Sequence, residues 1–211
     1  LVFALVASLV SAYVLIPRIT GMDRESTRRL LSESATFLFG VGGLICIVLA
    51  VFMPQFLAFL YPDLALSSYQ TEFILLARIL LLQPILLGLS GVLASVTQVH
   101  RRFVLFALSP VLYNLGIIAG TVYFYPLWGL PGIGAGVVIG SIAYLAVNIP
   151  VVVSAGVIPS LRFPRLALMM PVVRDSIPRS LALGMGSVTV LVLTVFASRI
   201  GTGAVSVFTF A

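Results

Sequence analysis

Apolar runs long enough to cross a lipid bilayer as a helix, roughly 20 residues each, recur along the whole of this sequence. After an apolar segment at 1–17, they lie near residues 34–60, 71–99, 103–125, 131–153 and 178–198. Only 9% of the 211 residues are charged, whereas soluble domains have about a quarter. Because no strand-like alternation is visible, the sequence predicts an all-α fold, a polytopic helical membrane bundle.

The two ends of the sequence predict a fragment of a longer protein. No initiator Met precedes Leu1, and a further helix that begins near Ala204 stops at Ala211 before it can span. The segment 1–17 lacks the basic region and the small-residue cleavage site of a signal peptide. We therefore expect it to be the end of a spanning helix.

The distribution of charge predicts the orientation in the membrane. Every cation is arginine, and ten of the twelve lie in alternate connections: Arg18, Arg24, Arg28, Arg29; Arg101, Arg102; Arg162, Arg165, Arg174 and Arg179. The intervening connections at 61–70 and 126–130 contain none. By the positive-inside rule, the arginine-rich connections face the cytoplasm. The net charge of +6 is thereby explained, so we expect membrane lipids and no nucleic acid as partners.

Two of the polar side chains within the expected spans stand out, because an unpaired polar group is costly there. Asn114 follows Pro110 by four residues, and this proline predicts a helix kink with an unbonded carbonyl. Asn114 either bonds a neighbouring helix or lines a water-filled cavity. Arg78 either snorkels outward or faces an aqueous interior. Glu72 is a poor partner for Arg78, because six residues place them roughly 120° apart on a helix.

Three glycines mark a close helix contact. Gly132, Gly136 and Gly140 recur at every fourth position of "GIGAGVVIG", which makes one smooth helical stripe suited to helix packing. The spacing differs from the G-x-G-x-x-G nucleotide fingerprint, and no strand precedes it.

The inventory of reactive side chains does not favour an enzyme. The chain has one His, one Cys and six acidic residues, too few to assemble a nucleophile with its base and orienting acid. His100 alone cannot form a metal site, and Cys46, alone in an apolar span, is expected to be a packing residue. We expect no cofactor and no metal. Transport or a structural membrane role remains.

The order of these features resembles the MurJ (MviN-type) lipid II flippases of the MOP flippase and exporter superfamily. The resemblance rests on the stretch 76–120, "LARILLLQPILLGLSGVLASVTQVHRRFVLFALSPVLYNLGIIAG", and continues to "TVFASRIGTGAVSVFTFA" at the end of the chain. It includes the short motifs Ala77-Arg78-Ile79, Arg102-Phe103 and Ser109-Pro110 with Leu112 and Asn114, and then Gly136-Val137, Gly140 and Asn148-Ile149-Pro150.

This resemblance implies fourteen helices in two six-helix lobes plus a terminal pair, of which the chain holds the second to the seventh. Residues 1–153 would belong to the N-terminal lobe, 154–177 to a cytoplasmic interlobe connection, and 178–211 to the C-terminal lobe. It also implies a monomeric transporter of the bacterial cytoplasmic membrane. Such a protein flips a lipid-linked anionic substrate, the peptidoglycan precursor lipid II, by alternating access through a cationic cavity.

Some family positions depart from the pattern. The cavity arginines fall outside the sequence, whereas Arg78, Asn114 and Ser206 match positions that make them substrate-cavity candidates. The carboxylate of the family's sodium site is replaced by Leu193, and a common glutamine by Ser187, so sodium coupling through this site is not expected. A polysaccharide or multidrug exporter of the same superfamily and a non-transporting membrane scaffold are the alternative functions.

The topology can be tested by labelling single cysteines in intact cells, in a Cys46→Ser background. We expect Arg101→Cys and positions in 156–178 to be shielded from an impermeant thiol reagent, and Asp63→Cys to be labelled from outside. External labelling at position 101 would reverse the topology and remove the flippase interpretation.

Overall fold

The computed structural model describes residues 10, 12–62, 69–160 and 162–200. These residues form helices and no strand, so the predicted all-α class is confirmed. Within them, four helices are long and apolar enough to cross a membrane: Arg24–Val51, Gln70–Val99, Phe103–Trp128 and Leu130–Ala155. A shorter apolar segment, Gly184–Ala197, lies in the last helix. The predictions for 1–9 and 201–211, including Ser206, concern residues outside this description.

The first span is an α-helix with a π-helical insertion. It consists of α3 (Arg24–Phe37), η1 (Leu38–Gly42) and α4 (Gly43–Val51), and it follows α2 (Ala12–Ile19). The helix starts well before the expected residue 34, because the Asp23 carboxylate caps it by accepting the N–H groups of Glu25 and Ser26 at 3.1 Å each. Hydrogen bonds from Ser26, chiefly from its side chain, hold the pKa of Asp23 below its usual value of 3.8.

The expected run 34–60 is divided at Phe52, where α4 ends and α5 (Met53–Leu60) begins. The second span is divided in the same manner at Leu81, between α7 (Gln70–Leu80) and α8 (Leu82–Val99). Each break lies shortly before a proline, Pro54 or Pro84. A proline has no N–H for the carbonyl four residues earlier, which favours a break at that point.

The remaining helices follow the predicted apolar runs more closely. The third span contains α9 (Phe103–Ala119), η2 (Gly120–Phe124) and α10 (Tyr125–Trp128), and α9 continues through Pro110 as a helix. The fourth is α11 (Leu130–Ala155). The last helix, α12 (Leu166–Ile200), starts inside the segment 154–177 that was expected to be a connection, and it continues through Pro171 and Pro178.

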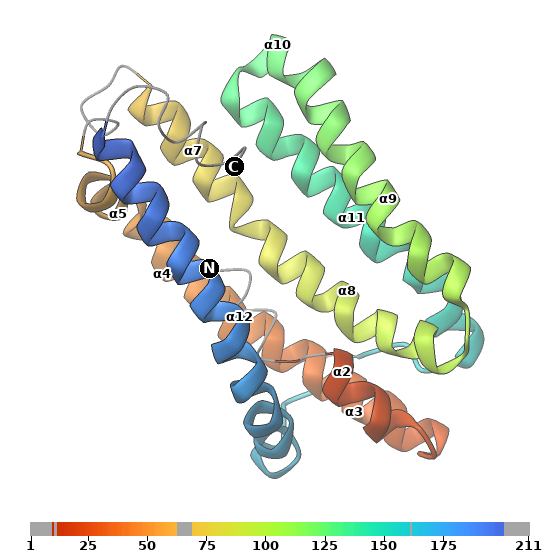
Figure 1. Cartoon of the computed structure of the whole chain (residues 1–211). Coiled ribbons are helices and arrows are strands. Elements are labelled where there is room, and N and C mark those ends of the chain that lie inside the picture. Colours follow the sequence, from red (N-terminus) through yellow and green to blue (C-terminus); the bar gives the residue numbers. More distant parts are fainter. Residues whose placement is uncertain (1–9, 11, 63–68, 161, 201–211) are drawn as a thin grey trace.

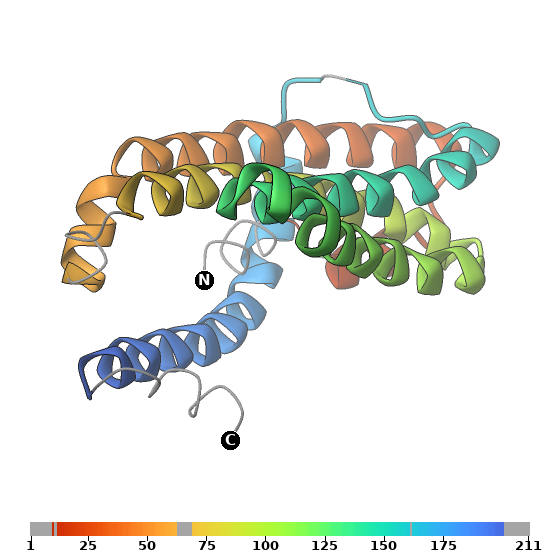
Figure 2. The same cartoon turned by 90° about the horizontal axis from the view of Figure 1, so that it is seen from above.

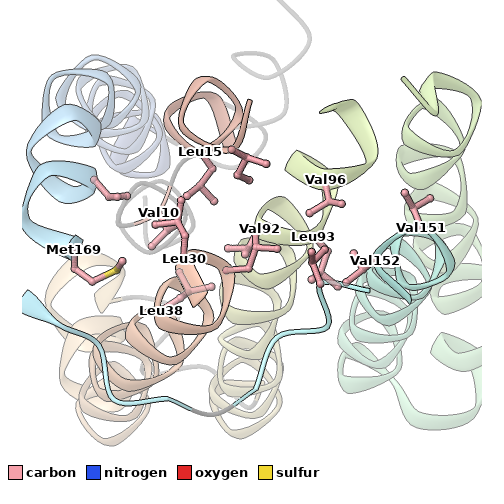
Figure 3. Close-up of a cluster of buried hydrophobic side chains, with 14 of the residues drawn as sticks. Val10, Leu15, Leu30, Leu38, Val92, Leu93, Val96, Val151, Val152 and Met169 are labelled. Carbon is pink, nitrogen blue, oxygen red and sulfur yellow. The ribbon is translucent and has the colours of Figure 1, made fainter. Parts of the chain in front are cut away.

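In the bundle, α11 packs against α9, α8 and α7, while α2 packs against α8 (Figure 1). The first part of α12 contacts α2 and α3, and its second part leaves the other helices (Figure 2). A hydrophobic core joins α2, α3, α8, α11 and α12, with Leu15, Leu38, Val92, Val152 and Met169 among its labelled members (Figure 3). Because Met169 is buried in this core, the first turns of α12 belong to it.

The glycine stripe of α11 lies against the backbone of α9. A Cβ on Gly120 of η2 would lie 2.8 Å from the Cα of Gly136, and one on Gly140 would lie 2.5 Å from the carbonyl oxygen of Tyr113. A Cβ on Gly132 would meet the Phe124 carbonyl. Side chains larger than hydrogen would therefore push the two helices apart.

The connection between α11 and α12 passes beside α3 (Figure 2) and is bonded to its polar side chains. Three of its backbone N–H groups donate to α3 side chains: Ser160 to Ser32 at 3.0 Å, Arg162 to Thr36 at 3.3 Å and Arg165 to Glu33 at 3.0 Å. In return, the guanidinium groups of Arg24 and Arg28 each donate to a carbonyl of the connection at 3.3 Å. These bonds hold the connection on the first span.

Substitution of one glycine tests the α9–α11 contact. Gly136→Ala places a Cβ against the backbone of α9, so we expect a loss on the order of 1–3 kcal/mol in unfolding free energy, and a larger loss for Gly136→Leu. Thermal unfolding in detergent would measure it. Gly91→Ala is the matched control, because a Cβ there meets nothing within 4 Å. Normal stability and membrane abundance of Gly136→Leu would mean that this face contacts lipid instead.

Candidate functional site

The polar groups inside the spans differ in whether the protein itself satisfies their hydrogen bonds. Asn148 of α11 is fully buried and joins three helices. Its side-chain oxygen accepts from the Thr97 hydroxyl of α8 at 2.9 Å, and its amide donates to the Ser109 hydroxyl of α9 at 3.3 Å. The amide also donates to the Tyr144 carbonyl at 3.0 Å. This network is fully satisfied, so its role in the bundle is to fix the helices.

Asn114, unlike Asn148, has a side chain that is not hydrogen-bonded within the described protein. It lies near the middle of the span Phe103–Trp128 and is exposed, and no hydrogen bond joins it to another described residue. The α11-facing positions of α9 are instead Ser109, Tyr113 and Gly116. The sequence left two interpretations of Asn114 open, a hydrogen bond to a neighbouring helix or a position in a water-filled cavity. Among the described helices, Asn114 makes no such hydrogen bond.

Arg78 stands in the last turn of α7 and donates from its Nε to the Ala50 carbonyl of α4 at 3.0 Å. In a continuing helix, this carbonyl would accept the N–H of residue 54. Residue 54 is proline and has no N–H to donate. The Arg78 guanidinium thus satisfies a carbonyl that the break after α4 leaves open.

An apolar groove adjoins Arg78, with a volume of about 510 Å³. One wall comes from η1 and α4 and the other from the α7–α8 break; the lining residues include Gly40, Gly43, Ile47, Leu81, Leu82 and Ile85. We call this the α4–α8 groove. A second, smaller pocket of about 280 Å³ lies under Pro159 and Ser160 of the connection, and Phe39 lines both. Asn114 lines neither, so the structure does not bring Arg78 and Asn114 together.

Three other residues singled out in the sequence, Cys46, Ser187 and Leu193, do not join Arg78 and Asn114 in one polar site. Cys46 is buried in α4 as a free thiol on the wall of the α4–α8 groove. Leu193 of α12 is exposed, and Ser187 is half-buried. Among the described residues, no group of three or more His, Cys, Asp or Glu side chains could hold a metal ion.

Sequence reasoning did not anticipate the buried carboxylate of Glu33. It is 2% exposed, and it accepts from the Arg29 Nε at 3.0 Å as well as from the backbone N–H of Arg165. A signal was present in the polar run "SESAT" at 32–36, directly before an apolar span. The sequence could not indicate the backbone groups that bond Glu33 and Thr36, because Arg165 and Arg162 lie more than 120 positions further along the chain.

Comparison with known proteins gives a family match over nearly the whole chain. The family described as "Lipid II flippase MurJ" matches residues 3–211. A curated protein of Burkholderia cenocepacia named "Lipid II flippase MurJ" is 27% identical over 138 residues, which cover 62% of this chain and 27% of that protein. The chain thus spans about a quarter of the curated relative that it matches. No solved structure matches.

The buried network gives a prediction for Asn148. Asn148→Leu leaves the Thr97 hydroxyl without its acceptor, and we expect a loss of about 1–2 kcal/mol in unfolding free energy. Adding Thr97→Val should recover part of that loss, because it removes the unsatisfied partner, whereas Ser109 keeps its bond to the Leu105 carbonyl at 3.1 Å. Additive losses in the double variant, measured by thermal unfolding, would contradict the coupling.

Proposed function

Because this chain belongs to the MurJ family of lipid II flippases, we propose that it takes part in moving the lipid-linked peptidoglycan precursor across the bacterial cytoplasmic membrane. The chain supplies spanning helices of one lobe, residues 1–153, with 178–211 beginning the second lobe. Transport by alternating access fits a substrate whose charged head group cannot cross hydrocarbon unaided. The functional unit in this proposal is a monomer.

The observation that supports a transport path through this chain is the exposed amide of Asn114. An amide moved from water into hydrocarbon without a hydrogen-bond partner costs roughly 4–8 kcal/mol. Asn114 is exposed near the middle of an apolar span, so a lipid-facing position would carry this cost. The α9 face that bears Asn114 is therefore proposed to face a water-filled cavity between the lobes.

Thr121 lies seven residues after Asn114, on the same side of the helix, and is also exposed. Its hydroxyl bonds the Ile117 carbonyl of its own helix at 3.0 Å, which leaves the oxygen able to accept a further bond. These two side chains offer neutral hydrogen-bonding groups to a sugar–peptide head group. Ser206, outside the described residues, remains a further cavity candidate from the sequence.

The family match favours this function over the polysaccharide or multidrug exporters of the superfamily and over a scaffold. Those exporters would use the same kind of bundle with other cavity residues. The side chain of Leu193, where some relatives carry the sodium-site carboxylate, has no oxygen to offer a cation. We therefore propose that any ion coupling uses groups other than this position.

Substitution of Asn114 in the full-length protein tests the proposal. Asn114→Leu should reduce surface appearance of the lipid precursor about tenfold, the factor that corresponds to the loss of one hydrogen bond worth about 1.4 kcal/mol. Membrane abundance should stay normal, because the exposed Asn114 side chain makes no hydrogen bond to the other described residues that would hold the fold. Asn114→Gln should retain more activity, and Val111→Leu, at another exposed position of α9, is the control. Undiminished flipping by Asn114→Leu would exclude Asn114 from the path.

A further inference from the structure

The α4–α8 groove combines an apolar interior with a single cation at one end. Its lining residues are apolar apart from Arg78. Gly40 and Gly43 lie on the same wall, and a Cβ on either would meet nothing within 4 Å. The glycines therefore do not serve close helix packing here, in contrast to those of α11. They leave open a space of about 510 Å³ beside the spanning helices.

Arg78 lines this groove, and its guanidinium has donors that no described residue uses. Only its Nε is committed, to the Ala50 carbonyl at 3.0 Å, and a guanidinium has five N–H groups. Among the described residues, no carboxylate pairs with Arg78. The nearest acidic residue of its own helix, Glu72, lies beside Gly129 at the start of α11 instead. The two terminal nitrogens are thus available to an external anion.

The guanidinium lies toward the end of the two spans that the arginine distribution predicts to be outside, where a long arginine side chain can reach the head groups by snorkelling. Its acceptor, Ala50, is the residue before the end of α4, so the cation lies at the end of the span 24–51. Along α7, Arg78 lies eight residues, or about 12 Å, from the helix start. The groove extends from this level toward the middle of the membrane, past Cys46 and Phe39 of the preceding turns.

We propose that the α4–α8 groove binds one anionic phospholipid of the outer leaflet, with an acyl chain between α4 and α8 and the phosphate on Arg78. A guanidinium can hold a phosphate through two parallel N–H···O bonds. An anionic lipid is favoured over a zwitterionic one because its net charge complements a cation that no carboxylate neutralises. The apolar walls accept a hydrocarbon chain without leaving polar groups unsatisfied.

This site is distinct from the proposed transport path. Asn114 lies on an exposed face of α9 and does not line the groove. The bound lipid would brace the break between α7 and α8 against α4, because Arg78 would bridge the lipid phosphate and the Ala50 carbonyl. The inference concerns a resident membrane lipid and goes beyond the movement of the precursor.

The experiment uses the full-length protein in nanodiscs of phosphatidylglycerol and phosphatidylcholine in equal amounts. A fluorophore at Ile47→Cys, in a Cys46→Ser background, reports on the groove, because Ile47 lines it and is 63% exposed. Quenching by a doxyl-labelled phosphatidylglycerol is compared with quenching by the doxyl-labelled choline lipid. We expect the anionic lipid to bind roughly tenfold more tightly, the factor of one charge-assisted contact.

Two variants and a matched control assign the binding to the groove. Arg78→Gln should abolish the preference for the anionic lipid, and Arg78→Lys should retain part of it, since lysine acts as a point charge. Gly43→Phe should fill the groove and reduce quenching by both lipids. Gly91→Phe is the control, because that glycine also has open space around its Cβ but does not line the groove.

Three outcomes would overturn the proposal. The first is equal quenching by both lipids in the unsubstituted protein, which would mean that the groove holds bulk lipid. The second is quenching by neither, which would mean that another part of the full-length chain fills it. The third is an Arg78→Ala variant that loses precursor flipping while the lipid preference persists, which would place Arg78 on the substrate. Flipping by the Asn114 variants is scored separately, so the two proposals can fail independently.

Discussion

Where α9 and η2 pack against α11, backbone meets backbone, because Gly116 and Gly120 face Gly140 and Gly136. The Cα of Gly120 and the Cα of Gly136 lie so close that a single methyl group between them would collide with the main chain. Within a membrane, apolar side chains gain little by leaving lipid, so helix association depends on such close contacts and on interhelical hydrogen bonds. The same two helices carry Ser109 and Asn148, and Thr97 adds α8 to them. The glycine contact sets the separation, and the buried network sets the register.

How much could be predicted from the sequence depended on whether a signal was local. The apolar runs predicted the spans, and the spacing of Gly132, Gly136 and Gly140 indicated a packing face. The start of α3 was missed because hydropathy marks where a helix enters the hydrocarbon, whereas Asp23 and its hydrogen bonds mark where the helix begins. The partners of Glu33 and Asn148 could not be found, since nothing local specifies which distant backbone or hydroxyl group a buried polar side chain will meet.

Arg78 shows a similar limit within the candidate site. Its six-residue distance from Glu72 correctly indicated that the two would not pair. Pro54 was visible in the sequence too, but only the fold shows that the carbonyl left open by this proline is the acceptor for Arg78. The break that Pro54 causes after α4 thus explains what the charged side chain of Arg78 binds in the neighbouring helix. Asn114 was singled out by its position within a span, by Pro110 and by the family resemblance, and the structure adds that its helix turns it away from α11.

The pairing of Arg78 with Ala50 also bears on how the chain enters the membrane during synthesis. An arginine within a spanning segment lowers the tendency of that segment to partition from the translocon into lipid, by roughly 2.5–3.5 kcal/mol at the centre of a helix. Ala50 is translated before Arg78, so the open carbonyl at the end of the preceding span is already present when the arginine emerges. The earlier span can therefore offer this carbonyl to the guanidinium as soon as the later span enters the membrane. The order of residues along the chain, as well as their final contacts, allows this cation to reside at the membrane.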